Sequence, residues 1–249
     1  LKKNDWADFI VVNNLKDFII LQTYIKGKPL IKNEALKNEE LKPVLLNNFN
    51  AGYINPEDIK VEFVSDSMNV IEAFDGELTT KKISVKPFVK NNLVVSDLDN
   101  DILKLVVVNR YQNQKPKVGF LKNFGLKKGA LASSIAHDSH NIIAVGANDD
   151  DICAAINSLV ENKGGIVAQN GNDISLLPLP VGGLMSYEGL EIIAEKYKGL
   201  NKKAWEFGCK FNAPFMTLSF LSLLVIPEIK LGDRGLFDVN KFEFIPLFN

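Results

Sequence analysis

The chain is poor in the residues that build disulfides and metal sites, with two cysteines and two histidines in 249 residues. Cys153 and Cys209 lie far apart in the sequence and form no CxxC pair. This pattern disfavours a disulfide and favours two buried thiols in a reducing compartment. We therefore expect a cytoplasmic protein.

The chain also has almost no net charge and no long apolar run. The formal net charge is −1, so no general attraction to nucleic acid or to an anionic membrane is expected. The longest apolar stretch, 215–226, is interrupted by Thr217, Ser219 and Ser222, and no run reaches the ~18 residues of a spanning helix. The first residues, LKKNDWADFIVV, have no initiator Met and no signal-peptide layout. We expect a piece of a longer protein, with neither nucleic-acid nor membrane partners.

Two common catalytic motifs are absent as well. No GxSxG surrounds Ser133, Ser134 or Ser139, so a serine hydrolase is not supported. The glycine-rich GGLMS at 182–186 differs from GxxxxGK[ST], so nucleotide phosphate binding is not indicated. This loop either brings backbone N–H groups close to a ligand or forms only a tight turn.

The residues that are present predict a small N-terminal β piece. Residues 7–30 contain the β-rich runs FIVV and DFIILQTYI, separated by Asn13-Asn14 and followed by Gly27-Lys28-Pro29. This predicts two short paired strands. The polar stretch 32–50, with KNEALKNEELKPVL, predicts a short helix or a linker. We assign 1–33 to the first domain, 34–54 to a linker and 55–249 to the main domain.

The main domain is predicted to be rich in strands. IKVEF at 59–63 alternates apolar and polar residues, which favours a half-buried strand. LVVV at 105–108 is apolar on both faces and favours a central strand. GGIVAQN and ISLLPLP, joined by Gly171-Asn172, predict a hairpin, and FEF near the end predicts a last strand. The fold class expected is α/β or α+β, with a mixed sheet.

Two helices are expected among these strands. The acidic run Asn148–Asp151 precedes an apolar stripe that includes Ile152, Ile156 and Leu159. Asn and Asp cap helix N-termini, and carboxylates there interact well with the helix dipole, so capping is favoured over metal binding. Gly164-Gly165 ends this helix. A second helix is predicted over 188–204, with Leu190, Ile193, Ala194 and Tyr197 at core spacing.

Both histidines lie in one segment, AHDSHN at 136–141. On a helix, the spacing of His137 and His140 would give two ligands for zinc or iron. The flanking residues resemble strands, however, and no third histidine exists. Asp138, Ser139 and Asn141 are typical of turns closed by side-chain hydrogen bonds, with the histidines packed at a junction. The turn is favoured from spacing alone, and a role in a functional site stays open.

Longer strings resemble a known family. GFLKNFGLKKGALASSIAHDSHNIIAVGANDDDICAAIN, GGIVAQNGNDISLLPLPVGGLMS and FLSLLVIPEIKLGDRGLFD resemble the C-terminal region of bacterial and archaeal adenine deaminases. ADFIVVNNLKDFIILQTYIKGKPL resembles the segment that follows the catalytic barrel of amidohydrolases and completes a small β-sandwich. The resemblance extends over essentially the whole chain.

The resemblance implies hydrolytic deamination of adenine to hypoxanthine and ammonia by a (β/α)₈ barrel with a divalent metal, manganese or iron. The barrel's histidine and carboxylate ligands would lie upstream of this chain, so no metal ligand and no catalytic residue is assigned here. This chain alone should be inactive, and the barrel domain and further copies of the enzyme are its expected partners.

The resemblance also bears on the histidine segment. We hypothesise that His137, Asp138, Ser139, His140 and Asn141 help to close the barrel site or select the purine, because these side chains can hydrogen-bond a purine's edge. In a rival hypothesis the segment stabilises a junction between domains or subunits. Two further alternatives are an oligomerisation module that buries 215–226 against a neighbour, and a stand-alone purine-binding domain.

Overall fold

The computed structural model describes residues 2–30 and 46–249, which belong to two compact units, Leu1–Lys42 and Pro43–Asn249. Most of the predicted linker, 34–45, and with it the proposed short helix, lies outside the described residues. Its last part, 46–54, belongs to the second unit, where Phe49 and Ile54 are buried. None of the helices in the described ranges is long and apolar enough to cross a membrane.

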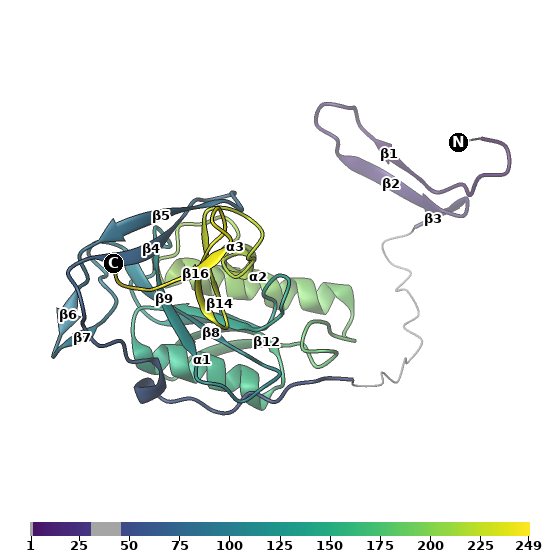
Figure 1. Ribbon diagram of the computed structural model, residues 1–249. Coiled ribbons are helices and arrows are strands. Elements are labelled where there is room, and N and C mark those ends of the chain that lie inside the picture. Colours follow the sequence, from purple (N-terminus) through teal and green to yellow (C-terminus); the bar gives the residue numbers. More distant parts are fainter. Residues whose placement is uncertain (1, 31–45) are drawn as a thin grey trace. The chain divides into compact units, whose positions relative to one another are not determined.

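The first unit is an antiparallel three-stranded sheet, β1-β2-β3 (Figure 1). Its strands are β1 (Phe9–Val12), β2 (Ile20–Ile25) and β3 (Lys28–Pro29). The predicted pairing of the first two strands is confirmed, and Phe9 stacks on Tyr24 with 4.6 Å between ring centroids. Many of its apolar side chains are exposed, among them those of Trp6, Leu15, Phe18 and Leu21. The described part of this unit thus leaves a large apolar surface uncovered.

The second unit is built on an eight-stranded mixed sheet with the order β13-β12-β10-β11-β8-β9-β4-β5. All neighbours are antiparallel except the parallel pair β4 and β9. The strands are β4 (Met68–Ala73), β5 (Thr80–Val85), β8 (Ile102–Val108), β9 (Lys117–Lys122), β10 (Ala130–Ser133), β11 (Ile142–Gly146), β12 (Gly165–Asn170) and β13 (Asp173–Pro178). The expected mixed sheet and fold class are confirmed.

Strand β8 lies inside this sheet and is buried over all seven residues. Because side chains alternate between faces, Leu105 and Val107 enter the core on one face, and Val106 and Val108 enter the core on the other. The prediction of a central strand from LVVV is therefore confirmed. A strand that is apolar on both faces requires a covering layer on each side.

Different elements supply the two layers. Helix α1 (Asp149–Glu161) packs on β10, β11 and β12 on one face. Helices α2 (Leu190–Glu206) and α3 (Pro214–Phe220) cover the opposite face, and Figure 1 shows α1 and α2 on opposite sides of the sheet. Smaller elements complete the unit, namely η1 (Pro56–Ile59), β6 (Val89–Lys90) and β7 (Leu93–Val94).

The start of α1 agrees with the sequence. Asn148 is the N-cap, and its Oδ1 accepts a hydrogen bond from the backbone N–H of Asp151 at 2.8 Å. The prediction of helix capping by the acidic run is confirmed. The helix ends at Glu161, just before Gly164-Gly165, and Gly171-Asn172 joins β12 to β13 as predicted.

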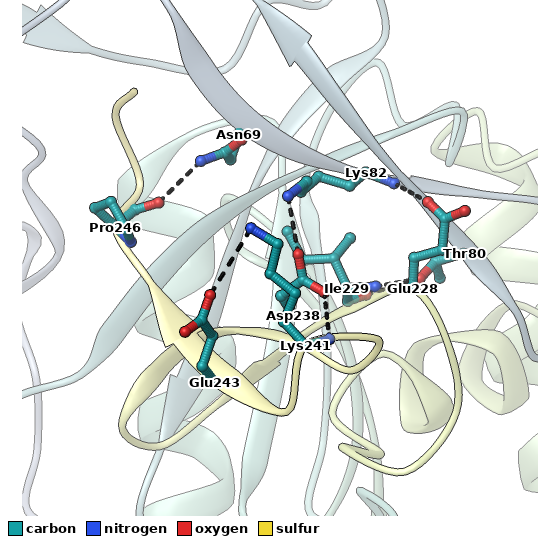
Figure 2. Close-up of polar contacts among 9 residues, drawn as sticks. All are labelled: Asn69, Thr80, Lys82, Glu228, Ile229, Asp238, Lys241, Glu243 and Pro246. Atoms are coloured by element: carbon teal, nitrogen blue, oxygen red, sulfur yellow. Dashed lines mark hydrogen bonds and ion pairs between the residues drawn. The ribbon is translucent and has the colours of Figure 1, made fainter.

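A C-terminal sheet of β14 (Ile229–Gly232), β15 (Gly235–Asp238) and β16 (Glu243–Ile245) joins the same face as α2 and α3. Polar contacts fasten it to the sheet edge (Figure 2). Lys82 of β5 donates from Nζ to Asp238 at 2.9 Å, and its backbone N–H donates to Glu228 at 3.0 Å. The Thr80 hydroxyl donates to the Ile229 carbonyl at 2.7 Å.

Three sequence expectations were wrong. IKVEF forms no strand; Ile59 ends η1 and Glu62 makes only an isolated bridge, because Pro56 starts a helical turn there. Leu190 is not in the core, with 82% of its surface exposed, because the first turns of α2 do not pack closely on the sheet. The apolar stretch 215–226 is largely buried in its own unit, by Phe215, Leu218 and Leu221.

Candidate functional site

The AHDSHN segment forms the connection between β10 and β11, two adjacent antiparallel strands. It closes on itself through the His140 N–H, which donates to the Ala136 carbonyl at 2.6 Å. The His137 N–H donates to the Ser219 carbonyl of α3 at 3.0 Å, which fastens the loop to the helix. The segment is a turn, so the histidines do not share a helix face as an HxxH pair would.

The structure separates the five predicted site residues. Asp138 and Ser139 are exposed at the turn, while His137 and His140 are half-buried. Asn141 is buried, and its Oδ1 accepts from the Arg110 backbone N–H at 3.3 Å. Of the five residues, only His137 lines the main hollow of the unit.

That hollow has a volume of about 630 Å³ and lies beneath the first turns of α2. Its walls come from β10, β12, β13, the segment between β13 and α2, and helices α2 and α3. Most of the lining is apolar, with a few polar side chains among it. The lining includes Ser133, His137, Leu177, Leu184, Met185 and Ser186. The volume lies within the range of small-molecule sites, which are commonly apolar with few polar groups.

Two separate motifs meet in this hollow. His137 belongs to AHDSHN, and Leu184, Met185 and Ser186 belong to the GGLMS loop. The two segments share no sequence pattern, and the 40 residues from 142 to 181 separate them in the chain. Their convergence is the main feature that identifies this region as a candidate site.

The His137 side chain is free to interact with a ligand. Its ring lies 4.6 Å from the Phe220 ring, and 6.0 Å separate it from the His140 ring. Within residues 2–30 and 46–249 no side chain or backbone group hydrogen-bonds its imidazole nitrogens. A half-buried imidazole of this kind can donate or accept one hydrogen bond at the edge of a flat heterocycle.

His140 has a different environment. Burial lowers the pKa of its imidazole, and the charges of Arg110 and then His137 lower it further. Its Nδ1 atom is buried without a hydrogen-bond partner among the described residues. Both effects favour the neutral form of the imidazole, and the positive φ of 53° at His140 fits its place near the end of the turn.

Arg110 connects the loops around the hollow and was not singled out from the sequence. It lies two residues after the end of β8 at Val108 and is 4% exposed. Its Nη1 donates to the Gly182 carbonyl at 2.7 Å, and Tyr111, beside it, donates from its hydroxyl to the Ser139 carbonyl at 2.9 Å. A basic residue after a buried strand was the only signal, and it did not reveal these partners.

Neither the acidic run nor the histidines gather metal ligands. Across the described ranges, no group of three His, Cys, Asp or Glu side chains is close enough to hold a metal ion. Cys153 and Cys209 are free and buried, and burial raises the pKa of their thiols to about 12 and about 11. The predicted buried thiols are confirmed.

Comparison with known proteins supplies the family. The model of the "Adenine deaminase C-terminal domain" matches residues 77–243, about two thirds of the chain. The chain belongs to this family. The match includes AHDSHN and GGLMS, so the hollow lies within the family's domain.

Curated relatives agree along the whole chain. An adenine deaminase of Methanosarcina barkeri is 49% identical over 257 residues, and one of Salinibacter ruber is 44% identical over 250 residues. Both alignments cover 100% of this chain and 46% of the relative. One of Borreliella burgdorferi is 40% identical, with 98% of this chain covered. The chain thus spans about half the length of the curated relatives it matches.

Proposed function

We propose that this chain is the accessory C-terminal part of an enzyme that hydrolyses adenine to hypoxanthine and ammonia. Its role is to close the active site or select the purine there, through the hollow that His137 and the GGLMS loop line. The convergence of these two motifs on one preformed hollow carries the proposal. The names of the relatives support the reaction.

The catalytic metal, manganese or iron, is assigned to the barrel half of the enzyme. The described residues here do not fit such a site, because no three ligand side chains come together. This chain's own contribution is to hold and orient the purine, which requires hydrogen-bonding groups within an apolar surround.

The N-terminal unit supports an assembly with the rest of the enzyme. Its hairpin exposes large apolar side chains, including Trp6 at 68% and Leu15 at 87% exposure. Contiguous exposed apolar surface marks an interface. We propose that this surface completes a β-sandwich with the barrel half, in a homo-oligomeric cytoplasmic enzyme.

Kinetics of the full-length enzyme test the role of His137. We expect His137→Ala to lower kcat/KM for adenine about tenfold to a hundredfold, because the hydrogen-bonding group at the hollow is lost. Asp138→Ala at the exposed turn is the matched control for a change in the same loop. Light scattering would verify an unchanged assembly, and unchanged kinetics of His137→Ala would contradict the proposal.

A purely structural role is the second candidate, favoured by the exposed hairpin. In that case His137→Ala would leave kcat/KM unchanged, and substitutions in the hairpin would release the two halves of the enzyme. Adenine binding by the 249-residue chain alone, seen as protection against thermal unfolding, would instead indicate a stand-alone purine-binding domain.

A further inference from the structure

We propose that Arg110 is a positioning residue for purine selection, which holds the AHDSHN turn and the GGLMS loop at the separation that the hollow requires. The inference rests on the proposed function of the hollow. It extends that function to a residue that does not line the hollow and that no motif identified.

The guanidinium reaches the GGLMS loop directly. Nη1 donates to the Gly182 carbonyl at 2.7 Å, and a Cβ built on the next residue, Gly183, would lie 2.1 Å from Nη1. The Ser134 hydroxyl, at the start of the β10–β11 connection, donates to the Gly183 carbonyl at 2.6 Å. The absence of a Cβ at Gly183 therefore allows the loop backbone to approach the Arg110 guanidinium, and Leu184 continues from there into the wall of the hollow.

Arg110 reaches the AHDSHN turn by two routes. Its Nη2 donates to the Tyr111 hydroxyl at 3.1 Å, and that hydroxyl donates to the Ser139 carbonyl at 2.9 Å. Its backbone N–H donates to Asn141 Oδ1 at 3.3 Å. Both contacts fall in the second half of the turn, at Ser139 and Asn141 on either side of His140, and so they hold the turn that carries His137.

The surroundings of Arg110 favour a positioning role over an ordinary ion pair. It is 4% exposed, and among the described residues it pairs with no carboxylate. Its guanidinium instead lies near the rings of Tyr111 and Phe49, at 4.9 and 5.8 Å from their centroids. A planar fork with several donors can serve a carbonyl, a hydroxyl and two rings at once, whereas a lysine ammonium cannot.

The test uses the full-length enzyme with Arg110→Lys and Tyr111→Phe, singly and combined. For each variant, kcat/KM would be measured for adenine and for the larger purine 2,6-diaminopurine. The ratio of the two values does not depend on the amount of folded enzyme, so a general loss of stability leaves it unchanged. Arg110→Lys should lower kcat/KM for adenine and change this ratio, each about tenfold or more, because small displacements of positioning groups have large kinetic effects.

Tyr111→Phe removes the route from Arg110 to Ser139 but leaves the contact to Gly182, so its effect should be smaller than that of Arg110→Lys. The double variant should be little worse than Arg110→Lys, because both side chains act through one chain of hydrogen bonds. Lys104→Met is the matched control. It removes another buried cation, which lies within β8 itself, near the opposite end of the strand from Arg110, where Nζ contacts Asp149 and Ile59. It should leave the substrate ratio unchanged.

Three results would overturn the inference. The first is that Arg110→Lys and Lys104→Met give the same ratio of kcat/KM for the two purines. The second is that the effects of Arg110→Lys and Tyr111→Phe simply add in the double variant. The third is a changed ratio in Arg110→Lys together with unchanged kinetics in His137→Ala, since Arg110 would then act elsewhere. If His137→Ala loses activity while Arg110→Lys keeps the normal ratio, the proposed function stands and only this inference fails.

Discussion

The Nζ atom of Lys104, on β8, lies 2.7 Å from the carboxylate of Asp149, the first residue of α1. It also donates to the Ile59 carbonyl at 3.1 Å. The Lys104 side chain is 1% exposed and that of Asp149 is 25% exposed. One buried cation thus connects the sheet, the helix α1 and the turn η1 that covers the same face.

This asymmetry in burial predicts the effect of removing each partner. Asp149→Asn leaves the more deeply buried charge without its partner and should lower the free energy of unfolding by about 3 kcal/mol. Lys104→Met leaves a carboxylate that water still reaches and should cost about 1–2 kcal/mol. Urea unfolding followed by circular dichroism measures both. A double variant whose cost equals the sum of the two single costs would contradict a direct interaction.

Asp238 predicts a stability effect at acidic pH. The hydrogen bond from Lys82 is the main cause that lowers the pKa of its carboxyl in the folded state. A lowered folded-state pKa stabilises the protein above the pKa of the unfolded chain, and this stabilisation is lost as the pH falls through the folded-state pKa. Wild type should therefore exceed Asp238→Asn in stability by about 1–3 kcal/mol at pH 6, and the difference should shrink from pH 4 downward.

Asp66 offers the control for this pH dependence. Its pair with Lys86 is exposed on both sides, at 3.5 Å, and such pairs contribute little. Asp66→Asn should leave the free energy of unfolding within about 0.5 kcal/mol of wild type at both ends of the range. Equal pH profiles for the Asp66 and Asp238 variants would show that the Lys82 contact does not stabilise the C-terminal sheet.

Lys230 predicts a second pH dependence, at alkaline pH, in which stability again rises with pH. Burial lowers its pKa to about 8, and its only described hydrogen bond is from Nζ to the Leu78 carbonyl at 2.7 Å. Between pH 8 and the unfolded value near 10.5, the unfolded chain binds more protons, so stability rises with pH. Across this window the free energy of unfolding of wild type should therefore rise relative to that of Lys230→Met, by about 3 kcal/mol at most. A difference that is constant with pH would contradict it.

The sequence predicted those elements whose local pattern agrees with their tertiary setting. The cap at Asn148, the central strand 105–108 and the hairpin at Gly171-Asn172 each depend on a few adjacent residues. Leu190 shows the limit: it has helical core spacing, yet α2 packs on the sheet mainly through Leu200 and Ala204. Apolar periodicity predicts which face of a helix is turned toward the core, but not which turns of the helix pack closely on the sheet.

The candidate site was predicted only in part for the same reason. The histidine segment drew attention by composition, but only His137 lines the hollow, whose walls come from elements distributed over residues 133–219. Arg110 hydrogen-bonds Asn141 and Gly182 directly, and Tyr111 links it to Ser139. Such contacts depend on strand order, which no local pattern contains.

Gly183 gives a last test of the contact between Arg110 and the GGLMS loop. Gly182 and Gly183 have φ values of +64° and +72°, so alanine at either position is strained, by about 1–2 kcal/mol. A Cβ at Gly182 meets nothing within 4 Å, whereas a Cβ at Gly183 would overlap Arg110 Nη1. Gly183→Ala should therefore cost about 1–3 kcal/mol more than Gly182→Ala, its matched control.

A shorter partner should relieve this overlap. Combining Gly183→Ala with Arg110→Ala removes the guanidinium, so the two substitutions together should cost less than the sum of their separate effects. Chemical unfolding of the four proteins measures the coupling. Additive effects, or equal costs for the two glycine variants, would mean that the loop moves freely past Arg110 and that the close approach of the two is not a constraint in solution.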